Sequence, residues 1–422
     1  MRIRIKIEYL YLRKKKCRYL SIFFLCLIIL FSFNDKVNKV SRVKVLTSSI
    51  KFIKKCLNGE LMYNISNKFS LNPKISAIIP LYNCEKTIKS TVRSIQNQNL
   101  TEFEIILVND NSKDNTSKII IFYNNFLKKE QKSEKFIWNK VIAQLAKDDD
   151  RIKILNNEKN MAALYSRNIG ILNSKGKYIM NLDNDDLFMD FDVFDNVYKE
   201  AEKGNFDIIG FGAIDSTSYN PKLTQMKDAL YHDHKDGLIL YQPELTYFPI
   251  TTSRNKFGEN DLHVWGRLTN SNIYKMAINN FGKNAIGEIR NLCFVTWAED
   301  SSISMAILRN AKSYKFIRKY GIFHYIGKTT TTNNVKSDIK IYGNLFFLDA
   351  IFDFSHENYK GKKYSVEMAT KRIFININKI SDGRNCRYLK AILNKMLACK
   401  YISLEDKEVI KQNLDIVNLK KK

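Results

Sequence analysis

The chain has 422 residues, and its 69 Lys and Arg residues outnumber its 43 Asp and Glu residues, which gives a formal net charge of +26. A hydrophobic fraction of 45%, with 26 Phe and 22 Tyr residues, excludes a globally disordered chain. The seven Cys residues lack the paired spacing of a zinc ribbon or a disulfide scaffold. The basic residues are spread over the whole length and form no clusters interleaved with aromatic residues, so we expect no nucleic-acid partner.

The amino-terminal segment combines a basic stretch with an apolar one. Residues 13–18 have the sequence RKKKCR, and residues 19–34 carry no charge. A helix of this length spans about 24 Å, less than the ~30 Å hydrocarbon core of a bilayer, but flanking Lys and Arg side chains can extend to the interface. Because residues 31–40 offer no small-residue cleavage site, we expect a basic cytosolic tail over 1–18 and an uncleaved transmembrane signal anchor over 19–34. A cleaved signal peptide and a peripheral hydrophobic arm remain the alternatives.

Such an anchor would place the rest of the chain on the far side of the membrane. We therefore expect a single-pass type II membrane protein that faces the lumen of the Golgi or the endoplasmic reticulum. Residues 35–73 are mostly polar and end at an Asn-Pro pair, which indicates a stalk. In a lumenal protein the N-x-S/T triplets would be glycosylation acceptors. These triplets begin at Asn64, Asn99 and Asn115.

Strands and helices alternate along the next hundred residues. Continuous apolar runs predict buried strands over 75–82, 103–110, 151–157 and 177–183. Helical apolar spacing predicts helices over 85–97, 114–129 and 161–174. This alternation predicts an α/β fold with a mostly parallel central sheet and helices on both faces. Ligands of such sheets bind beyond the carboxyl ends of the strands, where polar side chains follow the predicted strands here.

The acidic segment DNDD at 183–186 follows directly on an apolar strand. Asp183, Asp185 and Asp186 have no Lys or Arg beside them in the sequence. Like charges held together at a strand end are costly unless they share a cation. Carboxylate oxygens favour Mg²⁺ or Mn²⁺, with substrate phosphates completing the coordination shell. The alternative is a solvated Asp-rich turn, but polar residues after the strands that end near 80 and 110 favour a metal–diphosphate site.

Several segments together resemble the family 2 glycosyltransferases with the GT-A fold. The matching text is IIPLYNCEKTI at 78–88, ILVNDNSKDNT at 106–116, residues 148–186, VWGRLTNSNIY at 264–274, WAEDSSISMAILRNAKSYKFI at 297–317 and IFHYIGKTTTT at 322–332. The last of these resembles the closing loop of the family. The resemblance covers about 75–335, with an insertion at 128–148, and implies a GT-A glycosyltransferase domain over 74–335.

The resemblance implies a nucleotide-sugar site at the strand ends. Pro80 and Tyr82 match residues that shape the nucleotide pocket, with Tyr82 beside the base. Asp110 matches the carboxylate that accepts from the base, usually uracil. Asn111 stands where the family more often has Gly, a substitution that a turn with positive φ tolerates. Arg167 matches the basic residue that approaches the diphosphate, although the sequence alone leaves open that it lies on a helix surface.

The resemblance also implies a metal and a catalytic base. Asp183 and Asp185 match the two ends of the D-x-D motif, Asp183 toward the ribose and Asp185 toward Mn²⁺ or Mg²⁺, with Asp183 and His324 as further candidate metal ligands. Asp300 matches the catalytic base of inverting members. The sequence alone leaves two alternatives open: Glu299 and Asp300 could be an acidic pair at a helix start, and His324 an ordinary core histidine flanked by a tyrosine.

The chemistry of sugar transfer needs these residue types. Negative charge grows on the leaving diphosphate, and a divalent cation with a positive side chain stabilises it. The acceptor hydroxyl is a weak nucleophile, so a carboxylate on the opposite face must take its proton. One base and one metal imply a single displacement with inversion, whereas a retaining glycosidase needs two opposed carboxylates.

Residues 336–422 are predicted to form a helical appendage. Amphipathic spacing predicts helices over 341–354, 368–380 and 389–402. After residue 34 no apolar run reaches 18 residues, and the Q-x-x-R-W signature of processive members is missing, so we expect transfer of a single sugar.

The sequence therefore predicts a metal-dependent, inverting glycosyltransferase. Its donor is expected to be a nucleotide diphospho-sugar, in particular a UDP-sugar, and its acceptor a hydroxyl of a glycan, glycoprotein or glycolipid. One alternative is transfer to a polyprenyl-phosphate lipid. Another is a non-catalytic carbohydrate-binding or scaffold protein with the GT-A fold, against which the presence of Asp183, Asp185 and Asp300 argues.

Overall fold

The computed structural model describes residues 42–58, 60, 72–116, 149–228, 236–242, 244–245, 262–290, 295–327, 337–354, 383–399 and 402–419. The chain divides into two compact units, residues 1–51 and 52–422, and the account below concerns the second unit. The predicted anchor at 19–34, the predicted helix at 368–380 and most of that at 114–129 lie outside the described residues. Within the described ranges, every helix is too short or too polar to cross a membrane.

A mixed β-sheet forms the centre of this unit. Its strands are β1 (Ile75–Leu81), β2 (Phe103–Asn109), β3 (Ile152–Asn156), β4 (Tyr178–Asn181), β5 (Leu187–Phe188), β6 (Ile208–Ser216), β7 (Met226–Asp228), β8 (Ile239–Tyr241), β9 (Arg267–Asn270) and β10 (Ser313–Tyr325). They lie in the order β3-β2-β1-β4-β9-β6-β10-β5, with β7 on β6 and β8 on β10. The four strands predicted from apolar runs are confirmed as β1 to β4, which pair in parallel.

The prediction of a mostly parallel sheet is wrong for several strands of the other half, although β6 and β10 pair in parallel. Strand β9 is antiparallel to both of its neighbours, β4 and β6, and β5, β7 and β8 are also antiparallel to their partners. These four strands are only two to four residues long. Such short segments show no apolar periodicity, so the sequence pattern does not reveal them.

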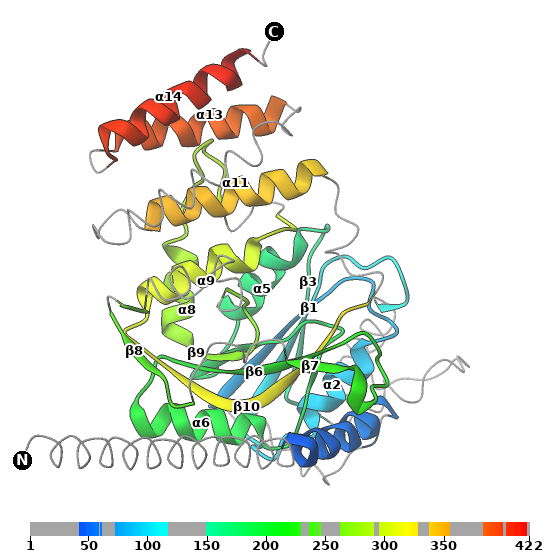
Figure 1. The fold of residues 1–422 in the computed structure, drawn as a ribbon. Coiled ribbons are helices and arrows are strands. Elements are labelled where there is room, and N and C mark those ends of the chain that lie inside the picture. The colour runs from blue at the N-terminus through cyan, green and yellow to red at the C-terminus, as the bar shows by residue number, and fades with distance from the viewer. Residues whose placement is uncertain are drawn as a thin grey trace, which may run out of the picture. The chain divides into compact units, whose positions relative to one another are not determined.

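Helices cover both faces of the sheet, as predicted. They are α2 (Ile88–Gln96), α5 (Ala162–Leu172), α6 (Val193–Gly204), α8 (Ser271–Asn279), α9 (Glu299–Asn310), α11 (Ser337–Phe354), α13 (Gly383–Ala398) and α14 (Leu404–Leu419), with a 3₁₀ turn at Leu223–Gln225. Figure 1 shows α6 below the sheet and α5, α8 and α9 above it. All residues of β1 and β2 are buried because successive side chains point to opposite, covered faces.

The alternation along β1 and β2 assigns their side chains to two separate cores. One core, shared with α2 and α6, contains Ile75, Ala77, Ile79, Phe103, Ile105 and Leu107. The other core, shared with α5, α8 and α9, contains Ile78, Ile106 and Val108. The continuous apolar runs in the sequence thus reflect burial on both faces.

Strand register brings the polar segments to one edge of the sheet. Leu81 pairs with Asn109, and Ile78 pairs with Asn181. Because these strands are parallel, the residues that follow β1, β2 and β4 leave the sheet at the same edge. The segments that follow these strands, with Tyr82, Asp110 and the acidic run at 183–186, therefore lie at this edge.

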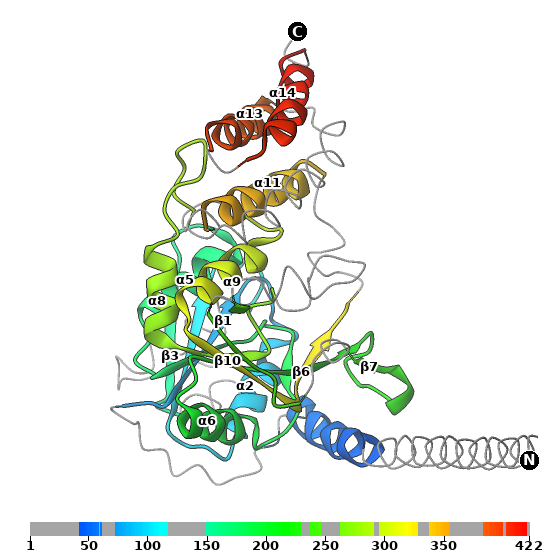
Figure 2. The ribbon, with the colours of Figure 1, turned by 60° about the vertical axis from the view of Figure 1, so that its left-hand side comes forward.

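The carboxy-terminal helices share a core with the sheet domain. Ile303 of α9, Leu345 of α11 and Leu389 of α13 belong to the same hydrophobic cluster as Phe316 of β10. Figure 2 shows α11 and α13 stacked in turn beyond α9. The predicted helices at 341–354 and 389–402 correspond to α11 and to α13, which begins earlier, and α14 was not predicted.

Part of the predicted polar stalk is a helix. Residues 42–57 are helical, and within the second unit Phe52, Ile53 and Cys56 are buried. The side-chain amide of Asn97 donates to the Glu60 carbonyl at 3.0 Å, which ties this segment to the end of α2. The spacing 52, 53, 56 is the i, i+1, i+4 pattern of an amphipathic helix, and the assignment of residues 35–73 to a stalk stays a prediction.

The close approach of α5 to the sheet gives a test of the fold. A Cβ added at Gly170 would lie 2.7 Å from Ile78 Cγ2 and 3.0 Å from Val108 Cγ2. We expect Gly170→Leu to lower the free energy of unfolding by about 1–3 kcal/mol through overpacking. On the same helix Leu172 is 43% exposed, so Leu172→Ala, the control, should change it by less than about 0.5 kcal/mol. Denaturant unfolding midpoints measure both, and equal midpoints for the two variants would contradict the packing described here.

Candidate active site

A buried arginine joins two acidic segments at the edge of the sheet. Arg167 lies on α5 with its side chain only 5% exposed. Its Nη2 donates to Asp183 Oδ1 at 2.6 Å, and its Nη1 donates to Asp300 Oδ1 at 2.7 Å. Glu299 Oε1 lies 3.8 Å from Nη1. The alternative that Arg167 is a helix-surface residue is therefore wrong, and the guanidinium connects the end of β4 to the start of α9.

This arrangement differs from the role that the resemblance implied for Arg167. Its two terminal nitrogens donate to protein carboxylates, so it neutralises the acidic cluster. Burial alone would lower the pKa of Arg167, but the charges of Asp300, Asp183 and Glu299 outweigh burial and raise it. The guanidinium is thus held charged, and a diphosphate would have to share it with these carboxylates.

Glu299 and Asp300 form the first turn of α9 and also face Arg167. The acidic pair at the helix start therefore also belongs to the site, because a helix that begins at this edge directs its first side chains toward the strand ends. Burial, then the neighbouring Asp300, raise the pKa of Glu299 to about 8. Burial also raises the pKa of Asp300, against the opposing effect of Arg167. The residue before them, Ala298, has φ 56°, a left-handed conformation that is costly for a residue with a Cβ.

The three aspartates of the DNDD segment occupy different environments. Asp183 pairs with Arg167. Asp186 is fully buried, and its Oδ1 accepts from the Tyr325 N–H at 3.0 Å. Burial raises the pKa of Asp186 well above its usual range. The side-chain amide of Asn184 donates to the Pro80 carbonyl at 2.9 Å and so fixes the turn against the end of β1.

Asp185 is the carboxylate whose surroundings fit a cation. Burial, then the charge of Asp183, raise its pKa to about 6. A bound divalent cation would remove both penalties, and a carboxylate oxygen is a ligand that Mg²⁺ and Mn²⁺ prefer. In the described ranges, no group of three or more His, Cys, Asp or Glu side chains is arranged to hold a metal. A metal at Asp185 and Asp183 would therefore need further ligands from outside these side chains, such as water and substrate phosphates.

His324 is a residue of β10 and lies near the acidic turn at 183–186. Its Nδ1 is 2.8 Å from Asp215 Oδ1, and its ring packs on Trp265 with centroids 4.9 Å apart. Burial alone would lower the pKa of His324, but the hydrogen bond to Asp215 and the charge of Asp186 raise it to about 9. The side chain is 30% exposed, so it is not the core histidine of the alternative interpretation. The role of His324 as a candidate metal ligand stays a prediction, and a protonated imidazole at this place would favour an anion.

The predicted nucleotide residues lie at the same edge of the sheet. Tyr82 is 45% exposed. Asp110 is buried, and its carboxylate accepts from the Asn157 side chain and from the Met161 and Ala162 N–H groups, each at 2.8 Å. Asp110 thus caps the start of α5, the helix that carries Arg167, and its predicted bond to a base stays a prediction.

Sequence analysis assigned no role to two residues of this region. Asp215 on β6 orients His324, and Trp265 packs against it. Trp265 lies in the VWGRL segment, which is one of the segments that carry the family resemblance. Asp215 lies in β6, a strand that the sequence pattern did not reveal. The predicted closing loop at 322–332 is also partly wrong, because 322–325 form the end of β10, where pairing with β6 makes them extended.

The comparisons with known proteins agree with this architecture. Residues 76–136 and 139–276 match the model of the family described as glycosyl transferase family 2. This match identifies a domain of this family within residues 76–276.

Curated relatives of this chain carry glycosyltransferase names. The uncharacterized glycosyltransferase EpsJ of Bacillus subtilis is 27% identical over 60% of this chain and 61% of its own length. The GalNAc(5)-diNAcBac-PP-undecaprenol beta-1,3-glucosyltransferase of Campylobacter jejuni is 29% identical over 33% of this chain. The match spans only 38% of that protein. This chain therefore covers less than two thirds of the length of each of these two relatives.

Solved structures share the fold at low sequence identity. The crystal structure of S. aureus TarS 1-349 in complex with UDP superposes with a TM-score of 0.53. It covers 82% of this chain and 89% of that chain at 15% identity. The complex with UDP-GlcNAc gives a TM-score of 0.54. This likeness confirms the predicted α/β fold of the GT-A type for the family 2 domain.

The raised pKa of Glu299 makes a pH-dependent prediction. Because the folded state raises this pKa from 4.5 to about 8, Glu299 binds its proton more tightly when folded. Its contribution therefore lowers stability as the pH rises from about 4.5 to about 8. We expect Glu299→Gln, which cannot ionise, to gain stability over the wild type by up to about 1.4 kcal/mol per pH unit in this window. Unfolding midpoints at pH 5, 6.5 and 8 measure the gain, Glu158→Gln controls for loss of an exposed carboxylate, and a pH-independent difference would contradict the assignment.

Proposed function

We propose that this chain is a metal-dependent, inverting glycosyltransferase that transfers one sugar from a UDP-sugar to a hydroxyl of a glycan, glycoprotein or glycolipid. The observation that carries the proposal is the convergence of Asp183 and Asp300 on the buried Arg167 at one sheet edge, with Asp185 in the same turn as Asp183. Asp300 is paired through Arg167 to the carboxylate predicted to contact the ribose, so the proposed base and the donor site are held together.

Each side chain has a chemical task in this proposal. Asp185 and Asp183 would hold Mn²⁺ or Mg²⁺, which when bound supplies charge stabilisation for the leaving diphosphate. Asp300 accepts the proton of the acceptor hydroxyl. Burial raises its pKa, which makes it a stronger base than an exposed aspartate, and the charge of Arg167 opposes this rise. His324, with a pKa of about 9, offers a second positive charge for the diphosphate.

The names of related proteins support the donor class and suggest a second acceptor class. TarS was crystallised with UDP and with UDP-GlcNAc, which supports a UDP-sugar donor here. The Campylobacter relative is named for a glucosyl transfer to a glycan on undecaprenyl diphosphate. A polyprenyl-linked acceptor is therefore the alternative that we retain. The anchor at 19–34, the lumenal localisation and the domain boundaries stay predictions.

The metal role of Asp185 predicts a specific loss of activity. With the full chain in detergent, UDP release would be measured from UDP-GlcNAc, UDP-glucose, UDP-GalNAc and GDP-mannose, each with Mn²⁺ and with EDTA. We expect release from one UDP-sugar that EDTA abolishes and that Asp185→Asn lowers about 100-fold or more, because each lost charge-stabilising group costs that much. Asp150→Asn, which removes an exposed carboxylate, should leave the rate unchanged. Release that survives both EDTA and Asp185→Asn would refute the metal assignment.

The base role of Asp300 predicts a different pattern. We expect Asp300→Asn to lower the turnover number of UDP release by about 10²–10⁴-fold, since a positioned general base contributes this factor. The dissociation constant for UDP with Mn²⁺, measured by calorimetry, should change by less than about threefold. A variant that turns over normally, or that loses UDP binding in proportion to turnover, would show that Asp300 is not the base.

A further inference from the structure

Helix α11 makes an unusually close contact with the turn that precedes the proposed base. Gly343 lies in the interior of α11 and is buried. A Cβ at this position would lie 2.1 Å from the carbonyl oxygen of Trp297 and 2.8 Å from its carbonyl carbon. Trp297 is only three residues before Asp300. The helix backbone therefore packs directly against the main chain that leads into the acidic pair.

The turn at 297–298 is strained, and α11 contacts it at a second residue as well. Ala298, between Trp297 and Glu299, has φ 56°. A left-handed conformation is unfavourable for an alanine and persists only where the surroundings hold it. Lys340, one turn before Gly343 on α11, places its Nζ 4.8 Å from the centre of the Trp297 ring. Contacts from one helix thus bear on both the main chain and the side chain of Trp297.

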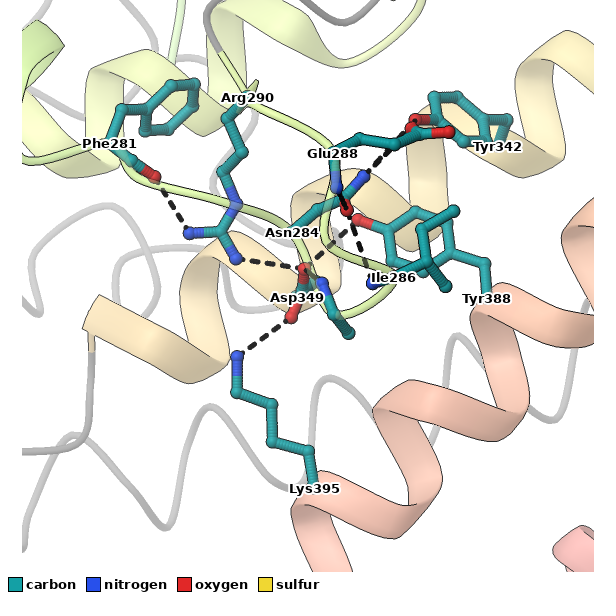
Figure 3. Close-up of polar contacts among 10 residues, drawn as sticks. Phe281, Asn284, Ile286, Glu288, Arg290, Tyr342, Asp349, Tyr388 and Lys395 are labelled. Atoms are coloured by element: carbon teal, nitrogen blue, oxygen red, sulfur yellow. Dashed lines mark hydrogen bonds and ion pairs between the residues drawn. The ribbon is translucent and has the colours of Figure 1, made fainter.

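A buried ionic cluster fixes α11 in this place. Asp349 of α11 is fully buried, and its Oδ2 accepts from Arg290 at 2.9 Å, from the Ala285 N–H at 2.7 Å and from Tyr388 at 3.1 Å. Its Oδ1 accepts from Lys395 at 3.1 Å. Figure 3 shows these donors converging on Asp349 from the loop before α9 and from α13. The carboxylate therefore locks α11 to both neighbours.

A second cluster ties the same three segments together. Glu288 accepts hydrogen bonds from Arg384 at 2.8 and 2.9 Å, from Asn284 at 3.1 Å and from Tyr342. Tyr342 is the neighbour of Gly343 on α11, and the Arg384 guanidinium lies 4.2 Å from its ring centre. Figure 3 shows Tyr342 with Glu288, and Asp349 with Arg290, Tyr388 and Lys395. Both clusters therefore hold α11, the helix that carries Gly343.

We propose that the carboxy-terminal helices α11 and α13 position the catalytic base, with Gly343 as the contact that holds the turn at 297–298 and so directs Asp300 toward Arg167. This inference rests on the proposed function. Gly343 is a positioning residue in this scheme, because it acts through Trp297 and touches no reacting atom. Glycine in a helix interior costs about 1 kcal/mol relative to alanine, and the close backbone approach is what requires it here.

The experiment compares two glycine substitutions in the carboxy-terminal helices. Gly343→Ala would push a Cβ against the Trp297 carbonyl and displace the turn, whereas a Cβ at Gly383, the first residue of α13, meets nothing within 4 Å. We expect Gly343→Ala to lower the turnover number of UDP release about 10–100-fold, since a misplacement of about 1 Å can cost that much. Its dissociation constant for UDP with Mn²⁺ should stay within about threefold of the wild type. Gly383→Ala should leave both quantities unchanged.

A second pair of variants, both on α13, tests whether the contacts that hold α11 also affect the turn at 297–298. Lys395 is 30% exposed and forms one of the ion pairs with Asp349. Lys395→Met therefore removes one ion pair from the cluster without adding bulk. We expect a smaller loss of turnover than in Gly343→Ala, again without loss of UDP binding. Arg387→Met removes an exposed charge from the same helix as the control. This pair decides the question should Gly343→Ala fail to fold.

The outcomes separate the inference from the proposed function. A wild type that releases no UDP from any donor and binds no UDP with Mn²⁺ would refute the proposed function. An active wild type with normal turnover in both Gly343→Ala and Lys395→Met would overturn the positioning role alone. A parallel loss of turnover and UDP binding would overturn it as well, because it would indicate general damage to the domain.

Discussion

The site depends on the buried guanidinium of Arg167. A guanidinium that is 5% exposed is tolerated only where carboxylates pair with it, and Asp183 and Asp300 do so from two different elements. Removing Arg167 would leave these carboxylates and Glu299 buried without compensation. The ion cluster therefore links the sheet edge to α9, and the capping of α5 by Asp110 places Arg167 at the junction. The proposed donor and base sites share one electrostatic support.

Local pattern predicted the four neighbouring parallel strands β1 to β4 and singled out the acidic segment at 183–186, whereas Arg167 and Asp300 were proposed from the family resemblance. Apolar runs locate β1 to β4 because both faces of these strands are buried, and helical spacing locates α2 and α5. The pairing of Arg167 with Asp300 joins residues 133 positions apart, which no periodicity reports. The strands β5, β7, β8 and β9 escape prediction for a related reason, since their short segments are extended only because neighbouring strands pair with them.

One turn contains three aspartates that the sequence cannot tell apart. In the structure Asp183 is paired, Asp185 is half-buried with a pKa of about 6, and Asp186 is sealed against the Tyr325 N–H. The difference arises from side-chain direction at the strand end. Asp186 points into the protein and braces the turn, so that Asp185 is left toward the edge where a cation and a diphosphate could meet. Three identical side chains of one turn thus differ in environment: one is paired, one is the proposed ligand and one is buried in the protein.

The carboxy-terminal helices are an integral part of the domain. They share a hydrophobic core with α9 and the sheet, and α11 meets the main chain before Glu299 at a glycine. The charge cluster around Asp349 is buried, so its desolvation is offset only while Arg290, Tyr388 and Lys395 all remain in place. Such a cluster adds little net stability compared with apolar packing, but it permits only one arrangement of the helices. Asp300, the proposed base, lies in the first turn of α9 and follows the strained Ala298. Its position therefore depends more on a fixed arrangement of the surrounding helices than on additional stability.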